Sequence, residues 1–324
     1  MNSLMNKLIA RQDLEEEEIR SIVEDIKNNA FDESQLGSIL CLLQAKGVKA
    51  EELHILVRSL MELAKTVNID EDCIDVCGTG GDGSKTFNIS TATAIVAAAA
   101  GAKVAKHGNK AISSNSGSFD VLQRLNISLD SDQLQSLKDN DVGFFFAPKH
   151  HPVFANIATL RKKLGIRTVF NLIGPLLNPA GVKRQLIGVY DPKLVQLVAG
   201  AMLLNGIEHG MVVHGNGLDE ITIDGKTNVA EIKDKRIITY EIDPKDYGMQ
   251  DSLENIRAES SEESAKMITE MMDGNKGPAR DIVLLNCAAA LKVAGKARDL
   301  KEGIEKAKET IDSGKAKQLM ERLG

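Results

Sequence analysis

A glycine-rich stretch, DVCGTGGDGSKTFNISTAT at residues 75–93, is the strongest indication of chemistry in the sequence. Glycines lack the Cβ atom that would hold an anion away from the backbone, so successive N–H groups can converge on a phosphate. Asn88, Ser90 and Thr91 follow at the start of a predicted helix, where unpaired N–H groups and the helix dipole favour negative charge. We interpret the stretch as a phosphate-binding loop. The alternative is a glycine-rich connector that binds no ligand.

A second group of anion-binding residue types occupies KHGNKAISSNSGS, residues 106–118, again after a predicted strand. Lys106 can place a point charge on a phosphate oxygen, and Ser114 and Ser118 can donate hydrogen bonds to it. The backbone around Gly108 can contribute further donors. Two such loops on neighbouring strands fit a ligand with two separated phosphate groups. In the alternative interpretation, the residues around Lys106 form only a solvated turn.

Two adjacent carboxylates, Asp219 and Glu220, lie in the loop HGNGLDEIT behind the apolar strand MVVH. Mg2+ commonly binds one or two carboxylates, keeps several waters and bridges to a substrate phosphate. We therefore predict a magnesium site at this pair, with the hydroxyl of Ser90 as a further ligand. An acidic pair on an ordinary solvated surface is the alternative.

Arg161 is the candidate for binding a carboxylate. It lies in TLRKKLG, on a predicted helix one turn before a glycine, and a guanidinium can hold a carboxylate with two parallel hydrogen bonds. Its two lysine neighbours leave open that Arg161 only belongs to a solvated face. The six histidines are not expected to form a metal-binding group, because the adjacent His150 and His151 point in different directions, and only His107 is expected in the site.

Composition excludes several other classes of protein. The chain has 324 residues and a formal net charge of -6, so no nucleic-acid partner is expected, because such binding relies on a basic face. No apolar run is long enough to cross a bilayer, and the N-terminus lacks the pattern of a secretory signal. We expect a cytoplasmic protein that does not contact membranes. The four cysteines lack the paired spacing of a zinc site.

The elements that must position these residues follow two patterns. Residues 1–66 are predicted to be helical throughout, because apolar positions recur at intervals of three and four, with Asp13 and Asp32 as N-caps. Beyond them, short apolar strands alternate with helices, which is typical of βα units. We predict an α/β protein with a small all-helical N-terminal domain and, over 67–324, a larger domain whose mostly parallel β-sheet is flanked by helices. Residues 152–182 are helical and are expected to complete the helical domain.

The motifs taken together resemble one family closely. In chain order they are DVCGTGGDG, NISTATA, KHGNKAISSNSGSFDVL, FFFAPKHHP, LGIRTVFNLIGPLLNPA, HGNGLDEIT and GPARDIVLLNCAAAL. Over nearly its whole length, the sequence is similar to the anthranilate phosphoribosyltransferase family. The resemblance implies transfer of the phosphoribosyl group of phosphoribosyl pyrophosphate (PRPP) to anthranilate in tryptophan biosynthesis, with Mg2+. It also implies the nucleoside phosphorylase type of architecture, a homodimer paired through the helical parts, and anthranilate synthase as a potential partner.

The resemblance also implies roles for individual residues. Mg2+ would bind Ser90, Asp219 and Glu220. Anthranilate would contact Gly78, His107, Asn109, Arg161 and Gly174. PRPP would contact Gly78, Gly81, Asp82, Thr86, Asn88, Ile89, Ser90, Thr91, Lys106, His107, Gly108, Asn109, Ser114 and Ser118.

The sequence departs from the family pattern where no ligand is proposed. Phe119 stands where the family commonly has Ala, Asn126 stands where Gly is usual, and the loop HGNGLDE is one residue short. Asn126 can still adopt the positive φ angle that glycine would provide, whereas Phe119 could narrow the second loop. One rival is a pyrimidine nucleoside phosphorylase, which would carry a KHSTGG-like loop in place of KHGN. The other is a non-catalytic relative that binds nucleotides or nucleic acid, which the intact Asn109, Arg161 and acidic pair disfavour.

Overall fold

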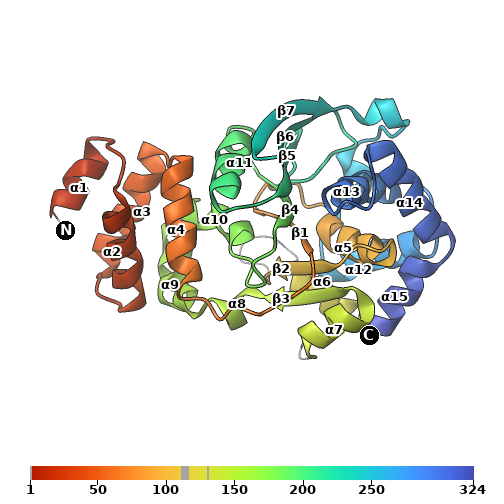
Figure 1. The fold of residues 1–324 in the computed structure, drawn as a ribbon, viewed down its shortest axis with the longest axis horizontal. Coiled ribbons are helices and arrows are strands. Elements are labelled where there is room, and N and C mark those ends of the chain that lie inside the picture. The colour runs from red at the N-terminus through yellow and green to blue at the C-terminus, as the bar shows by residue number, and fades with distance from the viewer. Residues whose placement is uncertain (1, 111–116, 130) are drawn as a thin grey trace.

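The N-terminal part of the chain is helical, in agreement with its apolar spacing (Figure 1). The computed structural model of the protein describes residues 2–110, 117–129 and 131–324. The N-terminal helices lie together at one end of the molecule, beside the sheet and its flanking helices. They are α1 (Asn2–Ile9), α2 (Glu16–Lys27), α3 (Glu33–Lys46) and α4 (Ala50–Met61).

One of the two predicted helix caps in this part is correct. Asp32 precedes α3, and its side chain accepts a hydrogen bond of 2.8 Å from a backbone N–H of the first turn. The prediction for Asp13 is wrong, because Glu15 is the residue that precedes α2. Asp13 instead forms ion pairs with Lys46 and Lys49. Charge pairing with a distant helix thus determines the position of this carboxylate.

The larger part of the chain is built on a mostly parallel sheet, which confirms the predicted fold class. The strand order is β3-β2-β1-β4-β5-β6-β7. Strands β1 to β5 run parallel, whereas β6 pairs antiparallel with both β5 and β7. The strands are β1 (Ile74–Gly78), β2 (Val104–Gly108), β3 (Val142–Phe146), β4 (Arg184–Gly188), β5 (His209–Gly215), β6 (Thr227–Lys233) and β7 (Arg236–Ile242).

Helices cover the sheet (Figure 1). Helix α13 packs against α5 and α14, and α11 packs against β5 and against α4 of the N-terminal part. Across the described residues, no helix is both long enough and apolar enough to span a membrane. The α-helices are α5 (Ile89–Ala99), α6 (Ser118–Arg124), α7 (Gln133–Asn140), α8 (Ala147–His150), α9 (Ala155–Leu164), α10 (Val169–Leu172), α11 (Leu194–Leu204), α12 (Ser261–Met272), α13 (Pro278–Val293), α14 (Leu300–Asp312) and α15 (Lys315–Leu323). The 3-10 helices are η1 (Pro152–Phe154), η2 (Gly174–Leu176), η3 (Pro244–Tyr247) and η4 (Leu253–Ile256).

Alternating side chains of β1 belong to two different apolar cores. Val76 of β1 belongs to a core that it shares with α5 and the C-terminal helices, whereas its neighbour Cys77 belongs to a core with α11 and the N-terminal helices. Packing between α11 and α4 is close, because a Cβ atom on Gly200 would lie 2.9 Å from the Cβ of Ala50. The N-terminal helices and one face of the sheet therefore share a continuous apolar interior.

Residues 155–172 leave the sheet and lie against the N-terminal helices. The side chain of Asn156 on α9 donates a hydrogen bond of 3.0 Å to the Ile26 carbonyl at the end of α2. Lys163, near the end of α9, pairs with Glu33 at the start of α3 at 2.7 Å. The chain therefore passes between the helical part and the sheet more than once.

The strand order reverses at β1, since β2 and β3 add to one side of it and β4 and β5 to the other. In open α/β sheets, such a switch point leaves a crevice at the carboxyl ends of the two strands, and ligands bind there. Here these ends are Gly78 of β1 and Gly188 of β4, which are partners in register. A Cβ atom added to Gly78 would lie 2.3 Å from Oδ2 of Asp219, and one added to Gly188 would lie 1.5 Å from the Asp219 carbonyl oxygen. The acidic loop therefore packs directly on the switch point.

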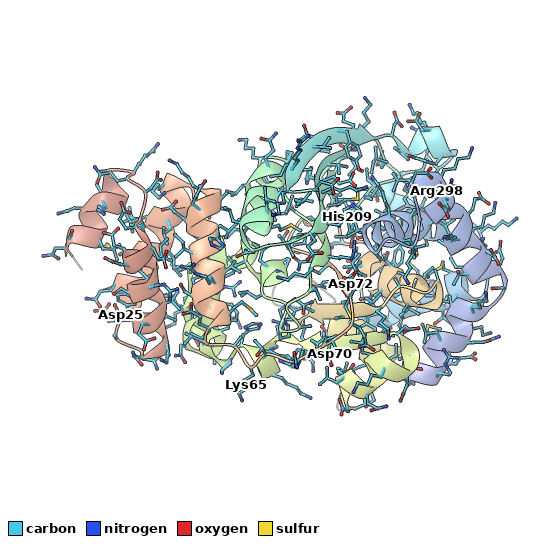
Figure 2. The ribbon with its side chains drawn as sticks, in the orientation of Figure 1. Asp25, Lys65, Asp70, Asp72, His209 and Arg298 are labelled. Atoms are coloured by element: carbon cyan, nitrogen blue, oxygen red, sulfur yellow. The ribbon has the colours of Figure 1, made fainter. Side chains whose placement is uncertain are left out.

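A buried polar network joins β5, β6, β7 and α13. Glu231 accepts hydrogen bonds from His209 at 2.9 Å, from Tyr240 at 2.8 Å and from Lys292 at 2.7 Å. Figure 2 shows His209 in the α/β part, far from the N-terminal helices. Burial alone would raise the pKa of Glu231, but hydrogen bonds from the three partners outweigh burial and lower the pKa to about 2. The ionised carboxylate therefore stabilises the folded protein.

Glu231→Gln is expected to lower the free energy of unfolding at neutral pH by roughly 3 to 5 kcal/mol, because it removes one member of a buried charge pair. The folded-state pKa of about 2 lies below the ordinary value of 4.5. The stabilisation is therefore complete above about pH 4.5 and is lost as the pH falls through about 2. Urea unfolding of both proteins between neutral and acidic pH measures this effect.

Glu241→Gln is the control for this prediction, because Glu241 forms an exposed ion pair with Lys226 at 2.7 Å. Exposed pairs contribute about 0 to 1 kcal/mol, so the control should change little. The prediction that the ionised Glu231 carboxylate stabilises the protein would be contradicted if the difference in unfolding free energy between wild type and Glu231→Gln did not decrease at acidic pH.

Candidate active site

The glycine-rich loop between β1 and α5 is positioned by the acidic loop. Gly80, Gly81 and Gly83 have φ angles of 67°, 74° and 79°, a region that residues with a Cβ atom seldom adopt. The Gly80 N–H donates a hydrogen bond of 2.6 Å to Oδ2 of Asp219, and the Asp219 N–H lies 3.4 Å from Oδ2 of Asp82. Two predicted loop residues, Gly78 and Asp82, therefore lie against Asp219, and a third, Gly81, directly follows Gly80 in the chain.

The start of α5 is held by contacts with the segment around α12. Thr86 forms an isolated β-bridge with Arg257, and the Asn88 N–H donates a hydrogen bond of 2.8 Å to the Ser264 hydroxyl. The Thr91 hydroxyl donates to the Asn88 side chain at 3.3 Å. Five predicted residues lie together at this helix start: Thr86, Asn88, Ile89, Ser90 and Thr91.

Lys106 is the buried cation of the site, with only 2% of its surface exposed. Its Nζ donates hydrogen bonds to the Val76 carbonyl at 2.5 Å and to the Ser90 hydroxyl at 3.2 Å. A buried charge is unfavourable unless hydrogen bonds or opposite charges satisfy it, and an ammonium group has three donors. Lys106 therefore connects β2 with the start of α5 and places a positive charge there.

Asp219 and Glu220 form a crowded acidic pair. Burial, and after it the charge of Asp82, raises the pKa of Asp219 to about 7. Burial and the charge of Asp219 raise the pKa of Glu220 well above its usual range, although Lys106 opposes the shift. Carboxylates crowded in this way favour a bound cation, because positive charge relieves both their desolvation and their repulsion.

The acidic pair fits the coordination chemistry of Mg2+. Among the described residues, no group of three or more His, Cys, Asp or Glu side chains forms a metal site. Mg2+ does not require such a group, because it takes one or two carboxylates and completes its octahedron with water and substrate oxygens. The backbone of Ser90 donates a hydrogen bond to Glu220, so the three predicted ligands lie close together.

The second anion loop is described at its two ends. Gly108 ends β2, and a Cβ atom there would lie 2.6 Å from Oγ of Ser118 at the start of α6. The Ser118 hydroxyl donates a hydrogen bond of 3.1 Å to the Asn109 carbonyl. These three predicted residues therefore lie together beside β2. Ser114, also predicted to contact the ligand, lies outside the described residues.

The departures at Phe119 and Asn126 are both accommodated in the fold. Asn126 has a φ angle of 60°, which confirms that asparagine replaces glycine here without loss of the backbone conformation. Phe119 is fully buried, and its ring centroid lies 4.8 Å from that of Phe146. A Cβ atom on Gly108 would lie 3.0 Å from the Phe119 ring, so the ring packs closely under the end of β2.

His107 and His151 lie side by side, with ring centroids 5.3 Å apart in an edge-to-face arrangement. Burial, and after it the charge of His151, lowers the pKa of His107 to about 3, although hydrogen bonding to the backbone of Gly174 opposes the shift. His107 is therefore neutral at pH 7. His151, which was not predicted in the site, therefore lies beside His107, whereas the adjacent His150 turns toward the Lys65 carbonyl.

Two arginines come from the segment that packs on the N-terminal helices. Arg161, in the last turn of α9, is half-buried, and burial lowers its pKa. Among the described residues its side chain makes no hydrogen bond or ion pair, including with the other predicted site residues. Arg167 was not predicted; it donates a hydrogen bond to the Gly81 carbonyl and lies 4.2 Å from the ring centroid of Tyr190. From the sequence, only the positive charge of Arg167 could have indicated these contacts, because Gly81 and Tyr190 are both distant from it along the chain.

Comparisons with known proteins follow the same division of the chain. Residues 2–64 match the helical bundle domain of the glycosyl transferase family, and residues 70–317 match the a/b domain of that family. An anthranilate phosphoribosyltransferase of Clostridium beijerinckii is 45% identical, over 100% of this chain and 97% of the relative. The chain belongs to the anthranilate phosphoribosyltransferase family.

Solved structures of anthranilate phosphoribosyltransferases have the same fold. The crystal structure of the enzyme from Thermus thermophilus has a TM-score of 0.92 and 36% sequence identity, and the match covers 99% of this chain and 98% of that one. The enzyme from Saccharomyces cerevisiae, in complex with PRPP and Mg, has a TM-score of 0.88 and 30% identity, over 99% and 96% of the two chains. The similarity to the anthranilate phosphoribosyltransferase family thus includes both the helical and the α/β part.

Proposed function

We propose that the protein transfers the phosphoribosyl group of PRPP to the amino group of anthranilate, in tryptophan biosynthesis. The products are N-(5-phosphoribosyl)anthranilate and pyrophosphate. One observation carries the proposal: the glycine-rich loop, Lys106 and the acidic pair converge at the switch point between β1 and β4. This arrangement combines backbone donors, a buried cation and a magnesium-type carboxylate pair, which suits a ligand with a pyrophosphate group.

The predicted residues divide between the two substrates. The loop at 78–83 and the start of α5 would bind the phosphate groups through backbone N–H groups, which need glycine or a helix N-terminus. Ser90, Asp219 and Glu220 would hold Mg2+. Bound Mg2+ supplies positive charge that offsets the negative charge of the pyrophosphate oxygens. Asn109 and Ser118 extend the donor surface to the second loop.

The reaction forms a bond between the anthranilate nitrogen and C1 of the ribose. The bond from C1 to the pyrophosphate oxygen breaks, and its electron pair leaves with pyrophosphate, while the nitrogen loses one proton to solvent. An aromatic amine is neutral at pH 7, so no strong base has to deprotonate it first. The contribution of Lys106 is therefore electrostatic: its ammonium group stabilises charge that grows on the leaving group in a water-poor site.

The acceptor side is formed by neutral and cationic groups. His107, which is neutral at pH 7, lies beside Gly174 and can contact an aromatic ring without a charge penalty. Arg161 is half-buried without a counter-ion in the described part of the chain, so a carboxylate is the partner that it lacks. We propose that Arg161 binds the carboxylate of anthranilate when the helical part closes on the α/β part.

Arg161→Ala is expected to raise the KM for anthranilate by about 10- to 100-fold, because hydrogen bonds to charged groups contribute roughly 1.5 to 3 kcal/mol. The KM for PRPP should change less than about threefold, because Arg161 is proposed to make no hydrogen bond to PRPP. Steady-state kinetics with each substrate varied in turn measures both values. Lys162→Ala is the matched control, since Lys162 is exposed on the same helix. Equal increases in both KM values would remove Arg161 from the acceptor site.

The proposed activity is tested by the loss of anthranilate fluorescence. Protein, Mg2+, PRPP and anthranilate are mixed, and parallel samples omit one component each. Fluorescence should fall only in the complete mixture, with equimolar release of pyrophosphate. Constant fluorescence in the complete mixture would overturn the proposal, and phosphorolysis of a pyrimidine nucleoside by the same sample would favour the nucleoside phosphorylase alternative.

The family resemblance supports further proposals on organisation. We propose a helical domain of residues 1–66 that is completed by residues 152–182, an α/β domain of residues 67–324, and a homodimer paired through the helical domains. We also propose that the protein acts in the cytoplasm, with anthranilate synthase as a potential partner. Light scattering coupled to size-exclusion chromatography measures the oligomeric state directly.

A further inference from the structure

Helix α13 carries a fully buried asparagine whose side chain contacts the backbone beside the acidic pair. Asn286 has 0% exposure. Its Oδ1 accepts a hydrogen bond of 2.9 Å from the Ile221 N–H, and its Nδ2 donates one of 2.8 Å to the Ile221 carbonyl. The second proton on Nδ2 is donated to the Ile282 carbonyl at 2.9 Å. The amide group therefore pairs with both backbone groups of one residue, as a neighbouring strand would.

This pairing compensates for the lack of regular structure at residues 219–222. Neither β5 nor β6 includes these residues, so the strand ladder does not pair their backbone groups, although the Thr227 hydroxyl of β6 accepts a hydrogen bond of 3.0 Å from the Thr222 N–H. Ile221 is fully buried, and a buried backbone N–H or carbonyl without a partner is unfavourable. An aliphatic side chain at position 286 would leave both groups of Ile221 unpaired. Asn286 is thus required by the loop rather than by helix α13, whose flanking positions are apolar.

Other contacts restrain the acidic pair on the side that precedes Ile221. The Asp219 side chain accepts a hydrogen bond from Gly80, and a Cβ atom on Gly215 would lie 2.6 Å from the Glu220 carbonyl. These contacts restrain Asp219 and the backbone of Glu220 from one side. Ile221 is the next residue along the chain, so its double hydrogen bond fixes the direction in which the chain leaves Glu220. Loss of this bond would leave the Glu220 carboxylate free to move away from Ser90.

We infer that Asn286 is a positioning residue that holds Asp219 and Glu220 in place to bind Mg2+ together with PRPP. The inference rests on the proposed function, because it assigns Asn286 to the metal-binding side of that site. Residues that orient metal ligands typically change metal affinity by 10- to 100-fold when they are replaced. Asn286 lies on α13, whose neighbours belong to one apolar core, whereas Arg161 lies on α9, whose neighbours belong to the other, so binding of anthranilate should not depend on Asn286.

The test compares Asn286→Ala, which removes all three hydrogen bonds, with Asn286→Asp, which keeps the size and the acceptor but removes the Nδ2 donors. PRPP is titrated into each protein by isothermal calorimetry at several Mg2+ concentrations. The Mg2+ concentration needed for PRPP binding should be at least about tenfold higher in both variants than in wild type. Steady-state kinetics should show a higher KM for PRPP and an unchanged KM for anthranilate. A purely structural role would not produce this selectivity.

Arg280→Met is the matched control, because Arg280 is also buried on α13 but pairs with Asp312 at 2.6 Å instead of the acidic loop. The control should lose thermal stability while its Mg2+ requirement stays at the wild-type value. If Asn286→Ala does not fold, Asn286→Asp decides the question. Wild-type Mg2+ dependence in both Asn286 variants, or an equal shift in Arg280→Met, would overturn the inference. Failure of wild type itself to bind PRPP would instead overturn the proposed function.

Discussion

Lys106→Met is expected to lower kcat/KM for PRPP by at least about 100-fold, the size of effect seen when one charge-stabilising donor is removed from an active site. Lys106 is the cation buried between the two anion loops, and it donates to the Ser90 hydroxyl at the start of α5. Methionine has a similar length but provides neither charge nor donor. The loss should appear in kcat as well as in KM, because charge on the leaving group grows in the transition state.

Lys103→Met is the control for the lysine prediction. Lys103 lies directly before β2, at the opposite end of that strand, where it pairs with Glu71 and Asp141 at 3.3 and 3.1 Å. Replacement of Lys103 should leave kcat and both KM values within about twofold of wild type, because its ion pairs lie at the surface. Rates for Lys106→Met within tenfold of wild type, with a folded protein, would remove Lys106 from the reaction.

Glu220→Gln is expected to have the second largest effect, through loss of Mg2+ binding. The substitution keeps the shape of the side chain but removes one of two neighbouring negative charges, so apparent Mg2+ affinity should fall by at least about tenfold. The protein without metal should be as stable as wild type or more stable, because burial and repulsion from Asp219 disfavour the ionised carboxylate and raise its pKa. Magnesium titrations of activity, together with thermal unfolding in EDTA, measure these opposite changes.

Glu208→Gln supplies the comparison for the glutamate prediction. Glu208 is exposed directly before β5, at the end of that strand remote from the acidic loop. Its Mg2+ titration curve should coincide with that of wild type. If the curve of Glu220→Gln coincides with wild type as well, the acidic pair does not bind the metal.

The sequence was sufficient to predict the elements around the site whose signals are local. Each anion loop directly follows a short apolar strand, so its place at the carboxyl edge of the sheet could be inferred from chain order alone. Glycines with positive φ and polar residues at a helix start are equally local features, as Gly80 and Asn88 illustrate. Strand β6 was not predicted, because its buried Glu231 interrupts the apolar pattern and is stabilised only by partners from β5, β7 and α13.

The contacts that could not be predicted all join distant parts of the chain. His151 reaches His107 because the turn after α8 returns beside β2, and Arg167 reaches Gly81 because the segment after α9 passes the phosphate loop. In the sequence, Asn286 is only a polar residue within an apolar helix, and its function depends on the hydrogen bonds to Ile221, which is distant along the chain. Sequence spacing carries no information on such pairs, because tertiary packing determines which residues meet.

A crystal structure with PRPP and Mg2+ bound tests the central claim most directly, namely that the switch point between β1 and β4 holds a metal-bound pyrophosphate. We predict the pyrophosphate against residues 78–83 and Lys106, and the metal within about 2.1 Å of a carboxylate oxygen of Asp219 or Glu220 or joined to it through one water. PRPP bound at another part of the sheet, or a metal with no link to either carboxylate, would contradict it.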